Sequence, residues 1–136
     1  MKKYLRVLIV ILVMSLLFGC SGNKLSDKFD EQEVLDKGKE VVDVINTRQY
    51  EDVIALLRED LRSQITADQL VTAWDDQIVA AGEFEKIRNT AIESQEDSVT
   101  KEEYVTVVLE AIYAEDTLIY TLSFDEDLMM IGLYMK

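Results

Sequence analysis

The chain is 136 residues long, which is enough for one domain with its own hydrophobic core. Its 27 acidic and 14 basic residues give a formal charge of −13, which disfavours binding to nucleic acid and to anionic lipid head groups. The sequence has no histidine and a single cysteine, which excludes Ser-His-Asp catalysis, disulfide bonds within the chain and zinc–thiolate clusters. We therefore expect neither a metal nor a cofactor.

The N-terminus has the pattern of a secretory signal. Three basic residues, Lys2, Lys3 and Arg6, precede a run of twelve mostly apolar residues at 7–18. A membrane span needs roughly 20 apolar residues, so this shorter run fits the core of a signal peptide better. Cleavage after the run would also remove the three basic residues and leave a mature chain with a formal charge of −16.

The signal ends in Leu17-Phe18-Gly19-Cys20, which resembles a bacterial lipobox. This resemblance implies a signal peptide at 1–19, a diacylglyceryl group on Cys20 and a short tether at 20–25. The domain at 26–136 would then lie on the outer face of the cell membrane, held by the two or more acyl chains that stable attachment requires. An ordinary signal peptide and a single N-terminal membrane anchor remain alternatives.

Three amphipathic helices are predicted after the tether, because apolar residues recur there at helical spacing. In the first, from about Ser26 to Asn46, Gly38 lies on the apolar face and indicates close approach of another element. The third begins at a capping box formed by Thr66 and Gln69 and ends at Gly82. The apolar faces of the three helices are Val34, Leu35, Val41, Val42 and Ile45; Tyr50, Val53, Ile54, Leu57 and Leu61; and Leu70, Val71, Trp74, Ile78 and Ala81.

Four strands are predicted in the second half of the chain, where the apolar residues alternate. They are expected at Phe84–Gln95, Tyr104–Tyr113, Thr117–Phe124 and Leu128–Met135. The short turns between them predict an antiparallel meander, and one apolar face per strand predicts a sheet covered by the helices on one side. On the last strand, alternation places Met129, Ile131, Leu133 and Met135 toward the core.

Three helices followed by a curled four-stranded antiparallel sheet form the α+β plan of the nuclear-transport-factor-2-like cone. Several local motifs occur in this sequence in a matching order: Tyr-Glu after the turn at 46–49, Gln-Leu and Ala-Trp in the third helix, Gly-x-Phe at 82–84, and a closing hairpin. Over about Val34 to Lys136 they resemble the domain-of-unknown-function family 3887. That resemblance implies the cone fold and a secreted or lipid-anchored protein of Gram-positive bacteria, but no activity.

A cone can enclose a pocket between its sheet and its helices. The core-facing aromatic and methionine residues are candidates to line a pocket for a small apolar ligand, and a filled hydrophobic core is the alternative that the same spacing predicts. Tyr104, which belongs to the other face of its strand, is a further candidate. The core-facing candidates are Trp74, Tyr113, Tyr120, Phe124 and Met129.

Catalysis is not expected, because Asp75, Asp76 and Glu110 all fall on faces predicted to be wet. A carboxylate there would not have its pKa raised by burial, as a general base near neutral pH requires. The acidic turns at 115–116 and 125–127 could suggest calcium, but the segment at 125–130 lacks the glycine and later carboxylate of a helix-loop-helix calcium site. Acidic residues are also common in hairpin turns, so we expect solvated turns. A cryptic enzyme that uses tyrosine and carboxylate groups is the alternative function.

Protein recognition is the other binding mode that the sequence allows. The outer face of the sheet is rich in threonine and would suit either an envelope protein or a second copy of the chain. Its residues are Thr106, Thr117, Ile119, Thr121 and Ser123. The sequence therefore predicts a lipid-anchored, non-catalytic binding domain, and leaves open whether it binds a small apolar ligand or an envelope protein.

Overall fold

The computed structural model describes residues 25–136. The predicted signal peptide, Cys20 and most of the predicted tether lie outside the described residues. Within the described part, four antiparallel strands and the helices that precede them form one α+β unit, which confirms the predicted fold class.

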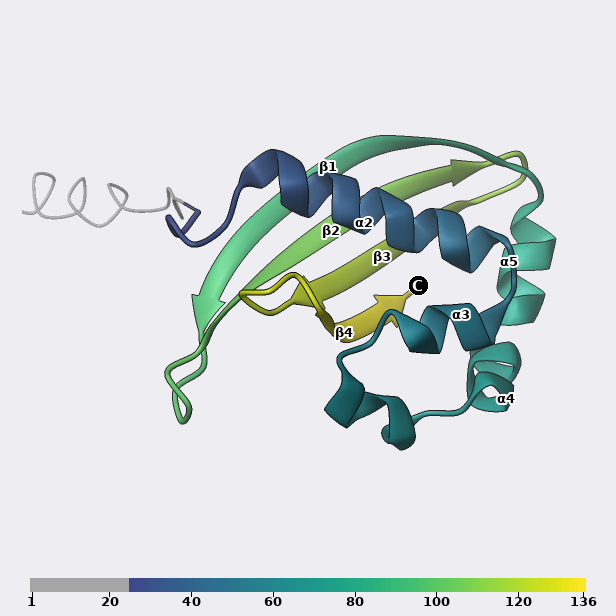
Figure 1. Ribbon diagram of the computed structural model, residues 1–136. Coiled ribbons are helices and arrows are strands. Elements are labelled where there is room, and N and C mark those ends of the chain that lie inside the picture. Colours follow the sequence, from purple (N-terminus) through teal and green to yellow (C-terminus); the bar gives the residue numbers. More distant parts are fainter. Residues whose placement is uncertain (1–24) are drawn as a thin grey trace, which may run out of the picture.

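The sheet is a strongly curved meander in the order β1-β2-β3-β4 (Figure 1). Its strands are β1 (Phe84–Glu96), β2 (Glu103–Tyr113), β3 (Thr117–Phe124) and β4 (Met130–Met135). Two register shifts interrupt the pairing of β1 with β2 near Lys86 and Asn89. Such bulges bend a strand and increase its twist, which helps β1 to curl around the helices.

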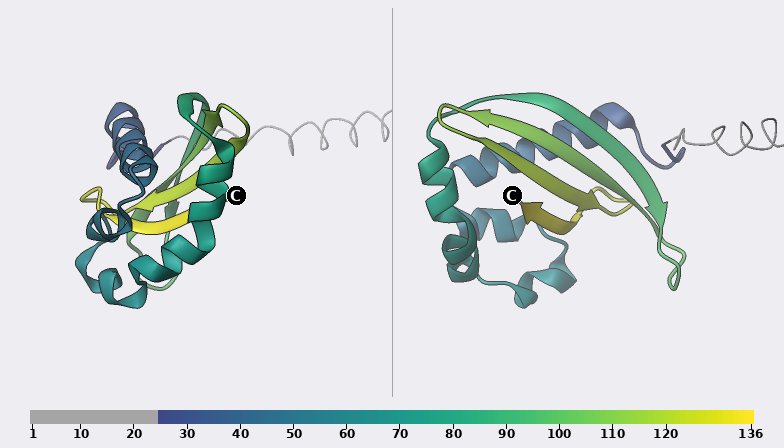
Figure 2. Two further views of the ribbon diagram at one scale, coloured as in Figure 1. Left: turned by 90° about the vertical axis from the view of Figure 1, so that its right-hand side faces the viewer. Right: turned by 180° about the vertical axis from the view of Figure 1, so that it is seen from behind.

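Helix α2 (Glu31–Asn46) lies across the concave face of this sheet (Figures 1 and 2). The Asp30 side chain caps its start by accepting a hydrogen bond from the N–H of Glu33 at 3.0 Å. Gly38 allows the helix to approach β2 closely, because a Cβ atom there would lie 3.0 Å from Cδ1 of Leu109. This close approach confirms the prediction made for Gly38.

The second helix is shorter than predicted. Helix α3 covers only Tyr50–Ala55, and a 3₁₀ segment, η1 (Glu59–Gln64), follows after a break. At the break Leu57 forms an isolated parallel bridge with Met130, and the N–H of Arg58 donates to the carbonyl of Met130 at 2.8 Å. The N–H of Leu57 still donates to the carbonyl of Ile54 at 3.0 Å, but the N–H of Arg58 pairs with strand β4 instead of with the preceding turn, so the helix does not continue.

The third helix is continuous but contains one wide turn. Segments α4 (Ala67–Leu70) and α5 (Asp76–Ala81) flank a π-helical turn, η2 (Val71–Asp75), which the sequence pattern did not predict. The capping box is confirmed, since the N–H of Gln69 donates to Oγ1 of Thr66 and the N–H of Thr66 donates to Oε1 of Gln69. Gly82 ends the helix with a φ of 84°, a region that glycine adopts without steric cost.

The predicted inward face of the last strand is confirmed at Leu133 and Met135 but is wrong at Met129. Met130 and Met135 are buried on β4, whereas Met129 is only half-buried. The register shifts by one residue where Ser123 pairs with Gly132 and Phe124 pairs with Met130. An extra residue at this bulge moves the inward position from Met129 to Met130, which alternation alone does not reveal.

Candidate ligand groove

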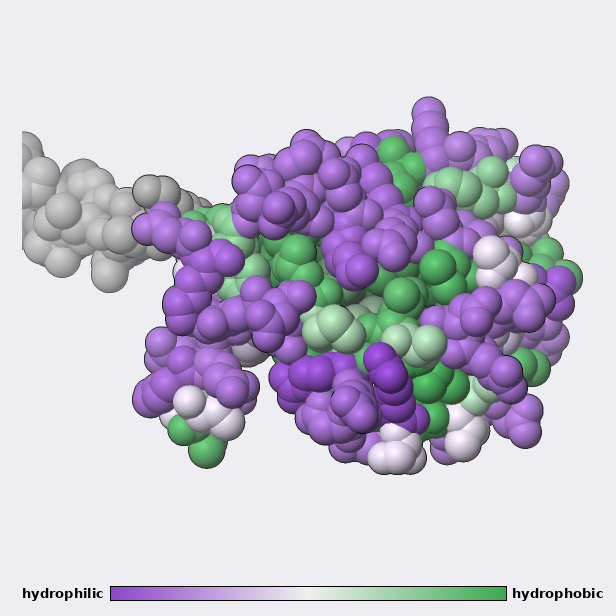
Figure 3. All heavy atoms as spheres, in the orientation of Figure 1, coloured by the Kyte–Doolittle hydropathy of each residue, from purple (hydrophilic) through white to green (hydrophobic). Residues whose placement is uncertain are grey.

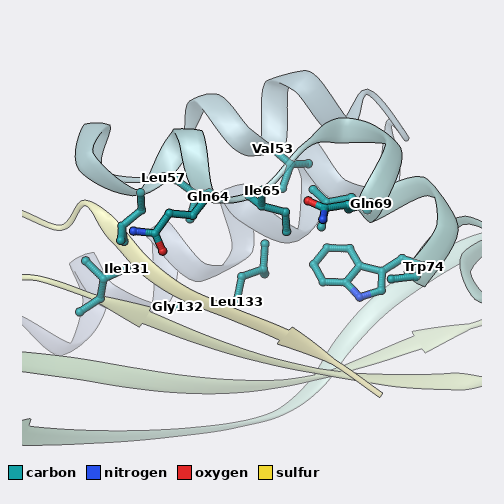
Figure 4. Close-up of a pocket in the computed structure, with 12 residues that line it drawn as sticks. Val53, Leu57, Gln64, Ile65, Gln69, Trp74, Ile131, Gly132 and Leu133 are labelled. Carbon is teal, nitrogen blue, oxygen red and sulfur yellow. The ribbon is translucent and has the colours of Figure 1, made fainter.

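An apolar groove of about 550 Å³ lies between strand β4 and the helical segments from α3 to η2. Figure 4 shows β4 along one side, with Leu57 near one end of the groove and Trp74 near the other. The volume falls within the range of small-molecule sites in proteins, about 300–1,000 Å³. The lining residues are Val53, Leu57, Leu61, Gln64, Ile65, Gln69, Leu70, Ala73, Trp74, Ile131, Gly132 and Leu133.

The groove is uncharged but not wholly apolar. None of its lining residues is acidic or basic, and its polar side chains are the amides of Gln64 and Gln69. The oxygen of the Gln69 amide already serves the capping box, which leaves its N–H groups for a ligand. Figure 3 shows hydrophobic side chains at the surface between α2 and the segment from α3 to α4, with hydrophilic residues around them.

The local structure places these side chains where a regular helix would not. The break after α3 turns Leu57 toward β4, and the 3₁₀ segment that follows brings Leu61 into the wall. Ile65 follows η1 in an extended conformation and also contributes to the wall. The irregular backbone between α3 and α4 therefore builds one side of the groove.

The predicted pocket residues are dispersed by the structure. Trp74, buried to 8% exposure, lines the groove, whereas Tyr120 and Phe124 have no exposed surface and belong to the filled core. Tyr113 lines a separate cavity of about 370 Å³. Met129 is half-buried beside the last turn, and its N–H donates to Oδ1 of Asp125 at 2.9 Å. Of the five, only Trp74 is therefore brought to the groove.

Sequence reasoning missed the other groove residues because it assigned them to the core or to no element. Ile131 and Leu133 were expected on an inward strand face, but β4 is an edge strand and leaves both half-buried. Ile65 continues the i, i+4 spacing of Leu57 and Leu61, but it lies beyond the apolar face expected for the second helix and was assigned to no element. This continuation of the apolar spacing past the helix was the available signal for the wall of the groove.

A small polar network ties α2 to the sheet inside the cone. The Tyr113 hydroxyl donates to Oδ1 of Asn46 at 2.5 Å and lies 2.8 Å from the Tyr120 hydroxyl. Burial raises the pKa of both tyrosines above the ordinary value, so both hydroxyls stay protonated at neutral pH. Nδ2 of Asn46 is buried and has no hydrogen-bond partner among the described residues.

Two of the candidate carboxylates, Asp75 and Glu110, are held in ion pairs, and none of the three lines the groove. Asp75 accepts two hydrogen bonds from Arg48, at 2.7 and 2.8 Å, and one from the Tyr50 hydroxyl at 2.9 Å. The bonds from Arg48 are the main cause that lowers the pKa of Asp75. Burial, followed by the bond to Asp75, raises the pKa of Tyr50 to about 12. Asp76, the neighbouring carboxylate, is exposed.

Glu110 lies on the outer, convex face of the sheet. It accepts hydrogen bonds from Arg88 and from Nδ2 of Asn89, and the bonds from Arg88 are the main cause that lowers its pKa. The acidic turn at 125–127 is held by its own backbone, since Oδ1 of Asp125 accepts from the N–H of Asp127 at 3.0 Å. Among residues 25–136, no group of three His, Cys, Asp or Glu side chains could hold a metal ion.

No helix within the described part of the chain is long and apolar enough to cross a membrane.

Comparison with known proteins identifies the fold and a family. A family model described as "Protein of unknown function (DUF3887)" matches residues 38–133. The chain is also similar to a solved structure, the "NMR structure of protein from Ruminococcus gnavus ATCC 29149", with 21% sequence identity and a TM-score of 0.74. The similarity covers 82% of this chain and 96% of that one, and it supports the fold alone. A search of the curated proteins finds no match.

Proposed function

The chain belongs to the DUF3887 family, and from that premise we propose that it is a lipid-anchored, extracytoplasmic binding domain that takes an apolar ligand in the groove beside β4. The observation that carries this proposal is the groove itself. Apolar side chains left open to water are unfavourable for folding, and contiguous apolar surface is typical of binding sites. The groove concentrates such side chains on an otherwise strongly acidic protein.

The proposed binding is non-catalytic. Because the sequence has no histidine, the usual candidate for a general base is a carboxylate with a raised pKa. The pKa values of Asp75 and Glu110 are instead lowered by their arginine partners, and neither residue lines the groove. The groove supplies apolar contact and two amide side chains, which suits recognition better than acid–base chemistry.

The groove also has better support as the binding surface than the outer face of the sheet. On that face the bonds of Arg88 and Asn89 already engage Glu110, and Thr106 pairs with Ser123 at 2.8 Å. These polar groups already form hydrogen bonds with one another. An envelope protein or a second copy of the chain would therefore gain little by desolvating them.

The proposed location follows from Cys20 and from the shortness of the tether. The backbone N–H of Ser26 donates to Oγ of Ser94 in β1 at 2.8 Å, and Leu25 packs against the core. The chain between Cys20 and Ser26 spans at most about 20 Å when extended. A lipid on Cys20 would therefore hold the groove near the membrane surface, where apolar ligands and segments of membrane proteins are concentrated.

Native mass spectrometry of the protein purified gently from its own host tests the proposal. We expect a co-purifying ligand that is lost when Ala73→Phe fills the groove, because Ala73 lines the groove and is exposed. Ala80→Phe is the matched control, since Ala80 is also exposed on the third helix but does not line the groove. Equal ligand occupancy in the two variants would refute the groove as the binding site.

A further inference from the structure

The groove is bounded by an open strand edge. In β3 and β4, the N–H of Ile119 donates to the carbonyl of Lys136 at 2.8 Å, and the N–H of Lys136 donates back at 3.1 Å. Antiparallel strands alternate between residues that point their backbone groups at the partner strand and residues that point them away. Leu133 and Met135 therefore direct their N–H and C=O groups away from β3, toward the side of β4 on which the helices lie.

No described residue pairs with this part of the edge. The outer side of β4 makes one isolated bridge, between Met130 and Leu57, where Arg58 also donates to Met130. Beyond this bridge, neither Leu133 nor Met135 has a backbone partner among residues 25–136. The chain at Leu57 and Arg58 thus pairs with the first residue of β4 and then turns away from the strand. The groove occupies the space beside the rest of this strand edge.

The side chains that line the groove would suit an extended segment paired with this strand edge. The partner of Leu133 across the ladder is Leu122, which is fully buried, so Leu133 projects from the concave face of β4 into the groove. Ile65 and Trp74 lie opposite it in Figure 4. An added strand lies about 4.8 Å from its neighbour and presents every second side chain to one face. Its alternate side chains would therefore enter the apolar space between Leu133 and the helices.

Charge distinguishes among apolar occupants. A fatty acid or an acidic phospholipid carries an anionic head that a nearby cation would stabilise, and no cation among residues 25–136 lines the groove. The wall segments η1 and α4 instead carry Glu59 and Asp68, which are exposed and make no ion pair in the described structure. The basic side chains of η1 and of the residue before it already have partners. Arg58 pairs with Asp60 at 2.7 Å, and Nε of Arg62 donates to the carbonyl of Leu57. Lys136 is the one cation at the end of β4.

We propose that the occupant of the groove is a short, basic, extended peptide segment of an envelope protein, which pairs with the open edge of β4 as a fifth strand and places alternate apolar side chains between Leu133 and Trp74. Backbone hydrogen bonds to Leu133 and Met135 supply register, and the groove selects the side chains. This inference rests on the proposed function, because it names the class of ligand that the same groove takes.

Fluorescence anisotropy with the full lipidated chain in phosphatidylcholine nanodiscs tests this inference, with empty nanodiscs as the baseline. The probes are rhodamine-labelled heptapeptides with lysine at both ends and valine, leucine or phenylalanine at alternate positions. We expect saturable binding by at least one member of the set. N-methylation of its alternate backbone amides should weaken binding at least tenfold, because it removes strand hydrogen bonds and keeps every side chain. Replacement of the terminal lysines by glutamate should also weaken binding at least tenfold.

The protein side of the pairing has its own matched variants. Leu133→Pro removes the N–H that points away from β3 and leaves the ladder with β3 intact, as proline on an edge strand allows. Leu133→Val keeps that N–H and trims the side chain. We expect the proline variant to bind at least tenfold more weakly than the valine variant. Should the proline variant fail to fold, the N-methylated peptides measure the same hydrogen bonds on the unaltered protein.

The outcomes separate this inference from the proposed function. Equal binding of the N-methylated and unmethylated peptides would overturn strand pairing. A lipid found by native mass spectrometry in the unaltered protein and lost in Ala73→Phe, with no peptide bound, would overturn the peptide and retain the groove. If neither a peptide nor a co-purifying ligand is found, both the inference and the proposed function fail.

Discussion

Substitution of Gly38 by alanine measures how closely α2 approaches the sheet. On an exposed helix this change stabilises a protein by about 1 kcal/mol, because glycine is the poorer helix former. Here the added Cβ would lie 3.0 Å from Cδ1 of Leu109 and 3.2 Å from Cγ1 of Val107. Both neighbours are fully buried and have little room to move. Overpacking of this kind costs about 1–3 kcal/mol, so we expect a net loss of about 1 kcal/mol.

A double-mutant cycle makes this prediction specific to the contact. Leu109→Ala removes Cγ and Cδ1, the atoms that lie 3.8 and 3.0 Å from the new methyl group. In that background Gly38→Ala should become neutral or stabilising, because much of the overlap is gone and the helix preference remains. Urea denaturation followed by far-ultraviolet circular dichroism measures the free energy of unfolding of all four proteins. The reasoning is refuted if Gly38→Ala stabilises both backgrounds equally.

Three further predictions concern the groove, an ion pair and the anchor. Trp74→Ala should lower the free energy of unfolding by about 3–5 kcal/mol in urea titrations followed by circular dichroism, because Trp74 packs into the core as well as the groove; a loss below about 1 kcal/mol would show that Trp74 is not part of the packed core. Arg48 lowers the pKa of Asp75 in the folded protein, so the stability that this ion pair contributes is present above the ordinary pKa of 3.8 and is lost as the pH falls below it. Urea midpoints measured from pH 7 to pH 2 should therefore fall more for the unaltered protein than for Asp75→Asn, and parallel curves would contradict this role of Asp75. Cys20→Ala should abolish metabolic labelling with a radioactive fatty acid and release the protein from the membrane fraction or leave it unprocessed, whereas unchanged labelling would exclude Cys20 as the lipidation site.

Regular elements with one buried face were predictable because their periodicity depends on a single partner surface. The alternation in β3 predicted Thr117–Phe124, which are its observed bounds. The hydroxyl and amide of Thr66 and Gln69 predicted the start of the third helix, since both groups of a capping box lie within one turn of each other. Such signals are local and hold whatever the rest of the chain does.

The groove was not predictable in the same way, because each of its walls departs from a regular period. The break after α3 depends on Met130, which lies more than seventy residues away in sequence and accepts a hydrogen bond from Arg58. The bulge that shifts the inward face of β4 depends on its pairing with β3. A local pattern records which residues prefer burial, but it does not record which distant backbone groups will satisfy them.

The sequence by itself determined the α+β class, the antiparallel meander, the close approach at Gly38 and the helix end at Gly82, because these features follow from hydrophobic period, turn length and the lack of a side chain. Only the tertiary structure decided which apolar residues remain partly open to water. Tyr120 and Phe124 face a completed core, whereas Leu133 projects from the same concave face of an edge strand that no further strand covers within residues 25–136. Burial of a side chain depends on what covers it, and that is a property of the assembled layers.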